Sequence, residues 1–145
     1  MGTGGSGSNG SAGTSVTGVE RLPGFQKKSL LLYYRGGEIW FEHLDGLYEH
    51  EALVLEKLKN DRKTFCRASY PSMIGFVLDE TEVTRNISEA IADALLHSGK
   101  LFRMVCFIGT DKKTRKALQA VLSDGTFMLE FINDLEKAKE WFIPE

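Results

Sequence analysis

The chain has 145 residues, of which 42% are hydrophobic and 26% are charged, and its formal net charge at pH 7 is -2. This length and composition are typical of one globular domain with its own core, and they exclude fibrous and largely disordered proteins. Lys and Arg are matched by Asp and Glu along the same segments, so we expect no nucleic-acid partner, which would need a basic field. We also expect no membrane insertion, because no apolar run has the length of a bilayer crossing.

Residues 1–18 consist almost entirely of Gly, Ser, Thr and Asn. Such a composition buries no apolar area and is typical of a flexible tail or an artificial linker. The start of the chain lacks the apolar core of a secretory signal, and Cys66 and Cys106 lie in different segments that do not call for a disulfide. We therefore expect one domain over residues 19–145 in a cytoplasmic protein.

The first predicted elements are a hairpin and a helix. Residues 29–44 form two apolar and aromatic segments around Gly36-Gly37, a dipeptide that suits a tight hairpin turn. Residues 48–61 have the periodicity of an amphipathic helix. The side chains expected on its buried face are Tyr48, Ala52, Leu55 and Leu58.

The rest of the chain alternates strands and helices. We expect strands at residues 73–80, 103–109 and 127–132, and helices at residues 87–99, 111–125 and 133–142. The strand at 103–109 is apolar on both faces, so we predict that it lies in the middle of the sheet. The order ββαβαβαβα predicts the α/β class, with a mixed, mostly parallel sheet that starts with a β-hairpin.

Two helix starts have the spacing of a capping box, in which an N-cap side chain accepts from the amide three residues on and a Glu reaches back. Asn86 with Glu89 predicts one such start, and Asn133 with Glu136 predicts another. For the helix at 111–125, Thr110 or Asp111 has the residue type of an N-cap.

The hairpin, the helix and a strand that ends in Val77-Leu78-Asp79, with Val83 four residues on, resemble the STAS domain of anti-sigma-factor antagonists. Within that superfamily the chain is similar to the small stand-alone SpoIIAA-like proteins, over about residues 29–142. The resemblance implies a bacterial regulatory module of signal transduction, without catalysis, whose partners are anti-sigma or related regulatory proteins. It also implies a regulatory Asp-Ser-Ser-Gly turn at the start of the next helix.

That turn falls on Ile87-Ser88-Glu89-Ala90, where only Ser88 keeps the family residue and Glu89 stands in the place of the phosphorylated serine. Glu89 is either a permanent charge in the place of a phosphate or a capping residue. We favour the cap, because it also accounts for Asn86. Ser88 and Thr84 are candidate phosphoacceptors, since a phosphate at a helix N-terminus meets free backbone amides, and an ordinary role in the turn is the competing interpretation.

We therefore expect a non-enzymatic module that binds a protein partner at the turn after the strand at 73–80. The candidate residues are Asp79, Thr81, Thr84, Asn86, Ser88 and Glu89. The alternative is a carrier or sensor of a small apolar or anionic ligand in a cleft at the strand ends, where open α/β sheets place ligands. A small enzyme with Asp79 or Glu80 as general acid or base is a third interpretation, which no second catalytic residue supports. No cofactor is expected, and no metal site, because His43, His50 and His97 lack ligand spacing.

Overall fold

The computed structural model describes residues 27–145. The tail assigned to residues 1–18 and the domain start assigned to residue 19 lie outside the described residues. The elements are β1 (Leu30–Tyr34), β2 (Gly37–His43), α2 (Glu51–Phe65), β3 (Met73–Val77), α3 (Arg85–His97), β4 (Met104–Ile108), α4 (Lys112–Val121), β5 (Met128–Phe131) and α5 (Leu135–Phe142). This order is the predicted ββαβαβαβα, and the α/β class is confirmed.

All five strands form one sheet in the order β1-β2-β3-β4-β5. β1 and β2 are antiparallel and the remaining pairs are parallel, so the mixed sheet with an initial hairpin is also confirmed. The predicted position of β4 was wrong, because β3 is the middle strand. Every residue of both strands is buried, so apolar character on both faces identifies an interior strand but does not choose between two of them.

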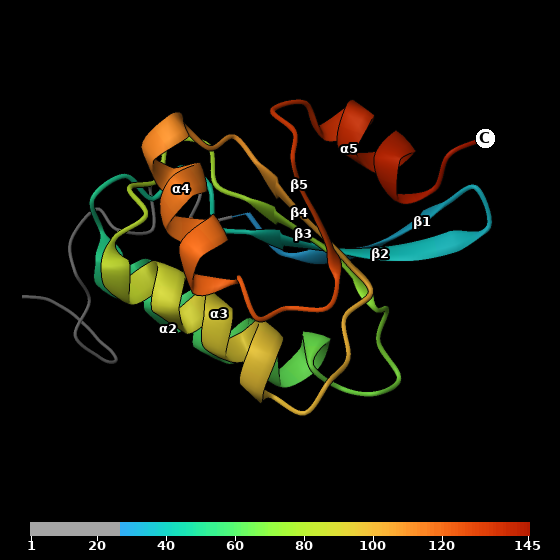
Figure 1. Cartoon of the computed structure of the whole chain (residues 1–145), viewed down its shortest axis with the longest axis horizontal. Coiled ribbons are helices and arrows are strands. Elements are labelled where there is room, and N and C mark those ends of the chain that lie inside the picture. The colour runs from blue at the N-terminus through green and yellow to red at the C-terminus, as the bar shows by residue number, and fades with distance from the viewer. Residues whose placement is uncertain (1–26) are drawn as a thin grey trace, which may run out of the picture.

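The core lies on both faces of the sheet, because successive strand side chains point to opposite faces. One face, named here the three-helix face, is covered by α2, α3 and α4, and the other, the α5 face, is covered by α5 (Figure 1). The strand side chains buried on the three-helix face include Trp40, Ile74, Phe76, Val105 and Phe107. Those on the α5 face are Ile39, Phe41, Met73, Val77, Met104, Cys106 and Ile108.

The predicted buried face of the first helix was shifted. α2 begins only at Glu51, and Tyr48 lies before it with a φ of 49° and an exposed ring. Ala52 is exposed, and Val54, Leu58 and Phe65 are the buried side chains of α2. Leu53, Val54 and Leu55 are consecutive apolar residues, so the periodicity alone did not fix which of them faces the sheet.

Local polar contacts fix the turns and helix starts. Arg35 and Gly36 both have positive φ angles, 49° and 82°, so the hairpin turn lies one residue earlier than the predicted Gly36-Gly37. Asp111 caps α4 as expected, since its Oδ1 accepts from the backbone amide of Thr114 at 2.8 Å. For α5 the N-cap is Asp134, so the predicted cap at Asn133 was wrong.

Gly75 in β3 offers a test of how tightly the α5 face is packed. A Cβ atom at this position would lie 2.7 Å from Cε1 of Phe41, which is itself buried against Phe142. We expect Gly75→Ala to lower the free energy of unfolding by about 1–3 kcal/mol, because the added methyl group overpacks the core. Gly36→Asn is the control, since the space around Gly36 is open and Asn tolerates its left-handed backbone. Equal denaturation midpoints for the two variants would contradict the expectation.

Candidate functional site

The carboxyl ends of β2, β3 and β4 meet at one edge of the sheet, where their loops hydrogen-bond to one another. The amide of Leu44 donates to the carbonyl of Val77 at 2.9 Å, and the amide of Gly46 donates to the carbonyl of Asp79 at 2.8 Å. The amide of Leu78 donates to the carbonyl of Ile108 at 2.8 Å. The loops are therefore joined by backbone hydrogen bonds, and of the predicted residues Asp79 and Thr81 lie among them, whereas the other four lie at the start of α3.

Thr81 ties the loop after β3 to the loop after β2. Its hydroxyl donates to the carbonyl of Leu44 at 2.5 Å and accepts from the amide of Leu47 at 3.1 Å. Asp79 is exposed and lies against Gly109, where any Cβ atom would overlap the Asp79 carboxyl group. Gly109 also has a φ of 81°, so both the conformation and the close approach require glycine at this position.

The predicted capping box at the start of α3 was wrong. The N-cap is Thr84, whose hydroxyl accepts from the amide of Ile87 at 3.3 Å and donates to Glu51. α3 therefore begins at Arg85, and Asn86 lies exposed in its first turn. Glu89 does not reach back to an N-cap amide, because its carboxylate pairs with Nε of Arg85 at 2.9 Å.

Ser88, a candidate phosphoacceptor at the helix start, is buried in the structure. Only 2% of its surface is exposed, and its hydroxyl donates to the carbonyl of Arg85 at 3.0 Å. A kinase needs an accessible hydroxyl, so this geometry disfavours Ser88 as a phosphoacceptor. The half-buried hydroxyl of Thr84 is also engaged, by its two hydrogen bonds at the helix start.

A groove of about 800 Å³ lies between the first turns of α3 and the length of α4, and we name it the α3–α4 groove. Four of the predicted candidates line it, namely Thr81, Thr84, Ser88 and Glu89. From α4 and its N-cap come Asp111, Lys113, Thr114, Ala117, Ala120 and Val121. Sequence reasoning missed this α4 wall, and the available signal was the spacing of small residues at positions 114, 117 and 120, which places them on one helix face.

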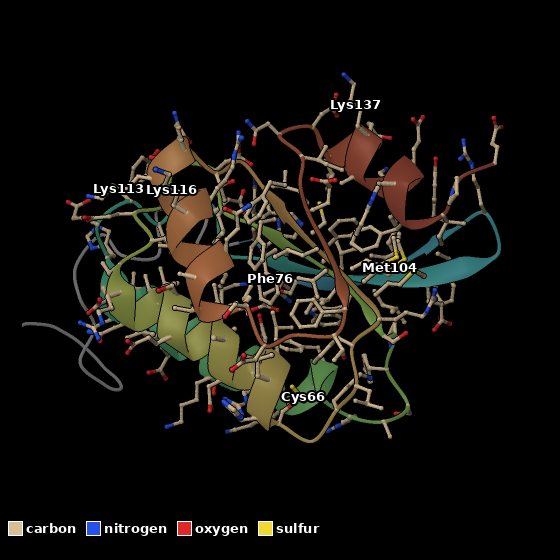
Figure 2. All side chains as sticks on the ribbon, viewed as in Figure 1. Cys66, Phe76, Met104, Lys113, Lys116 and Lys137 are labelled. Carbon is tan, nitrogen blue, oxygen red and sulfur yellow. The ribbon has the colours of Figure 1, made fainter. Side chains whose placement is uncertain are left out.

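The rim of the α3–α4 groove carries both signs of charge. Arg85 and Lys113 supply cations, and Glu82, Glu89 and Asp111 supply carboxylates. Figure 2 shows Lys113 extending from α4 on one side of the sheet, well away from the α5 side. Between the rims the α4 wall has only small side chains at its centre, so a bound chain could approach the helix closely.

A smaller pocket of about 340 Å³ adjoins the groove at the strand ends, and we name it the strand-end pocket. Its charged lining residues are Glu80, Glu82 and Asp111, all acidic. Thr110 also lines it and is 5% exposed, and among the described residues its hydroxyl has no hydrogen-bond partner. Most buried polar groups are satisfied, so this hydroxyl is an uncommon feature of the fold.

A carboxyl pair, which no sequence pattern suggested, joins β2 to α2 on the three-helix face and consists of Glu42 and the half-buried Asp61. Glu42 of β2 is fully buried, and its Oε1 accepts from Nε1 of Trp40 at 3.0 Å. Burial and the hydrogen-bonded Asp61 raise the pKa of Glu42 to about 9. Burial alone would raise the pKa of Asp61, but hydrogen bonds from Glu42 and from Ser29 lower it. At neutral pH the pair therefore holds one proton.

A second buried carboxylate, Asp45, lies in the loop after β2. Burial alone would raise its pKa, but hydrogen bonds with His43, at 3.1 Å, and Lys27, at 2.5 Å, lower the pKa to about 2. The pKa of Lys27 is raised in turn, first by its hydrogen bond with Asp45. Asp45 therefore stays ionised and holds the start of β1 to the loop edge.

Two substitutions at the start of α3 compare Thr84 with Asn86 as its N-cap. We expect Thr84→Ala to lower the free energy of unfolding by about 1 kcal/mol, because it leaves the amide of Ile87 without its acceptor. Asn86→Ala is the matched control and should change stability by less than about 0.5 kcal/mol, as exposed substitutions away from caps usually do. Chemical denaturation measures both values, and a larger loss in Asn86→Ala would restore the original capping box.

The carboxyl pair gives a pH dependence with a defined sign. The pKa of Glu42 is raised from its ordinary value of 4.5 to about 9 in the folded state, so its contribution to stability is present at low pH and is lost as the pH rises towards 9. Glu42→Gln keeps the acceptor for Trp40 and removes this ionisation. We expect the stability of the variant relative to wild type to increase between pH 5 and pH 9, by up to about 1.4 kcal/mol per pH unit.

The matched control for this pH series is Glu38→Gln, an exposed position on the same strand. It makes the same Glu-to-Gln change without altering a buried group, so it separates the effect of burial from that of the substitution itself. Because the pKa of Asp61 is lowered, its own contribution changes only at acidic pH, below this window. Parallel curves for Glu42→Gln and wild type would show that Glu42 ionises normally in the folded protein.

Residues 27–145 contain no cluster of three His, Cys, Asp or Glu side chains that could hold a metal ion. Within this part of the chain, no helix combines the length and the apolar character needed to cross a bilayer. No protein-family model, curated protein or solved structure matches the chain.

Proposed function

We propose that this protein is a cytoplasmic, non-enzymatic regulatory module of the STAS type, and that it binds a protein partner in the α3–α4 groove. The single observation that carries the proposal is the groove itself, whose lining includes four of the six residues selected from the sequence. In the resemblance to anti-sigma-factor antagonists, the turn before α3 is the regulatory surface. The partner would be an anti-sigma or related regulatory protein.

The composition of the groove favours a polypeptide as the occupant. Ala117 and Ala120 are exposed on its α4 wall, so a partner main chain meets no bulky side chain there. The charged rim supplies opposite signs on both helices, an arrangement that favours specific orientation and fast association of protein partners. A site for a small molecule would instead have predominantly apolar and aromatic walls.

The polar groups of the groove support binding rather than catalysis. The carboxylate of Glu89 is paired with Arg85, and that of Asp111 caps α4. The hydroxyls of Thr84 and Ser88 form hydrogen bonds within the helix start. The Thr84 hydroxyl also donates to the carboxylate of Glu51 on α2. Each of these groups therefore already stabilises the fold, and among the described residues none of the four forms a hydrogen bond to a histidine or a lysine of the kind that activates a nucleophile.

The second candidate function is the binding of a small ligand in the strand-end pocket. The observation that favours it is the buried hydroxyl of Thr110, which lines this pocket and is without a partner among the described residues. The acidic lining by Glu80, Glu82 and Asp111 favours a small cation over the apolar or anionic ligand expected from the sequence.

The test is affinity capture with charge reversal on the groove rim. Tagged wild type is compared with the double variant Arg85→Glu, Lys113→Glu, and retained proteins are identified by mass spectrometry. We expect the double variant to retain the partner at least tenfold less, because rim charges on both helices are inverted. The control is Lys59→Glu, Lys137→Glu, which makes the same charge change at exposed positions on α2 and α5. Figure 2 shows Lys137 on α5.

Melting curves first establish that both double variants are folded. Loss of the same protein from the rim variant alone supports the groove as the interface. Equal capture by wild type and both variants would exclude the groove, and a failure of all three to capture a protein would favour the strand-end pocket and its small ligand.

A further inference from the structure

β1 is an edge strand with an unusual composition. Its sequence is LLLYY, and its Leu30 and Tyr33 side chains are 43% and 71% exposed. Edge strands of monomeric proteins are commonly protected by charged residues, by proline or by short length. β5, at the other edge of the sheet, has only four residues and an exposed Glu130 among them. In the described residues, β1 has none of this protection along its five positions.

The backbone of β1 directs two residues outward. β1 pairs with β2 from Leu30 opposite Phe41 to Tyr34 opposite Gly37, across a two-residue turn. The pair next to such a turn exchanges hydrogen bonds, and pairs alternate along an antiparallel ladder. Residues 30, 32 and 34 therefore direct their amides and carbonyls to β2. The amides and carbonyls of Leu31 and Tyr33 point away from the sheet.

We infer that β1 pairs with β1 of a second copy of this chain, antiparallel and about a twofold axis at Leu32, so that two five-stranded sheets join into one. In this register Leu31 lies opposite Tyr33 of the partner subunit, and the outward backbone groups of both residues are satisfied. Leu32 lies opposite Leu32 of the partner subunit in a pair without mutual hydrogen bonds. An isologous contact of this kind closes on itself as a dimer.

The side chains fit the same register. Leu31 and Tyr33 lie on the three-helix face, since Leu31 packs against that core, and an aromatic ring opposite an aliphatic side chain is a favourable cross-strand pair. At the ends of the strand, Arg35 lies opposite Ser29 of the partner subunit, and Lys28 lies opposite Gly36 of the partner subunit. No cation therefore lies directly opposite a cation, and the register satisfies the hydrogen bonds of the outward backbone groups.

The dimer should be weak. A pair of five-residue strands buries less than the roughly 1,000 Å² that a stable interface needs to exceed, so we expect the dimer to dissociate on dilution. Sedimentation equilibrium of the full chain over a concentration series should show the apparent mass rising towards twice that of the monomer. A constant monomer mass up to about 1 mM overturns the inference.

Disulfide formation tests the register. Leu32→Cys places two thiols opposite each other across the twofold axis, where the Cα atoms of such a pair are about 4.5 Å apart and within disulfide reach. In the matched variant Leu30→Cys, the thiols are four residues out of register, or about 13 Å along the strand. Both variants carry Cys66→Ser, which removes the half-buried native thiol.

After oxidation with oxidised glutathione, we expect at least tenfold more disulfide-linked dimer from Leu32→Cys than from Leu30→Cys, on a non-reducing gel. Equal cross-linking of the two variants overturns the inference.

A second pair of variants tests the association without oxidation. Tyr33→Lys places a charge on the edge and should shift the protein to monomer, whereas Leu101→Lys, at a leucine that is 85% exposed, should leave the association unchanged. The same association in both lysine variants also overturns it.

Discussion

The positions of the helices on the sheet depend on the connections between neighbouring parallel strands. β2, β3, β4 and β5 are adjacent in the sheet in their chain order, and each parallel step needs a crossover that returns the chain to the same end of the sheet. Because such crossovers are right-handed, three successive steps in one direction place α2, α3 and α4 side by side on one face (Figure 1). The α3–α4 groove is thus a consequence of strand order, since it lies between two consecutive crossover helices.

The same strand order leaves one face of the sheet and one edge of the sheet without a crossover helix. The face without crossovers is closed by α5, whose Ala138 and Phe142 cover Phe41 and Met104. The edge is the outer side of β1, because a hairpin adds a strand without adding a helix to cover it. Among the described residues no element pairs with that edge. Association between two copies would close it without further structure.

Sequence reasoning succeeded where one residue property determines the structure. Five strands and the order of elements followed from apolar runs, and Ile87, Ile91 and Leu95, which lie at the spacing of one helix face, are buried in α3. It failed where several residues of the same type are close together. Thr84, Asn86 and Ser88 can each cap a helix, and the choice of Thr84 depends on Glu51, which is 33 positions away in sequence and in contact only after folding. The α4 wall of the groove was missed because it exists only through helix packing.

The polar residues between β3 and α3 stabilise the fold first, and this limits how the site can be regulated. Modification of Ser88 would require the first turn of α3 to open, because its hydroxyl is buried and bonded to the carbonyl of Arg85. Opening that turn would also give up the Thr84 cap, at a cost of about 1 kcal/mol. Arg85, Glu89 and Lys113 are exposed and can be contacted without any opening. Under the proposed function, regulation by competition for the rim would therefore need less rearrangement than a phosphorylation switch.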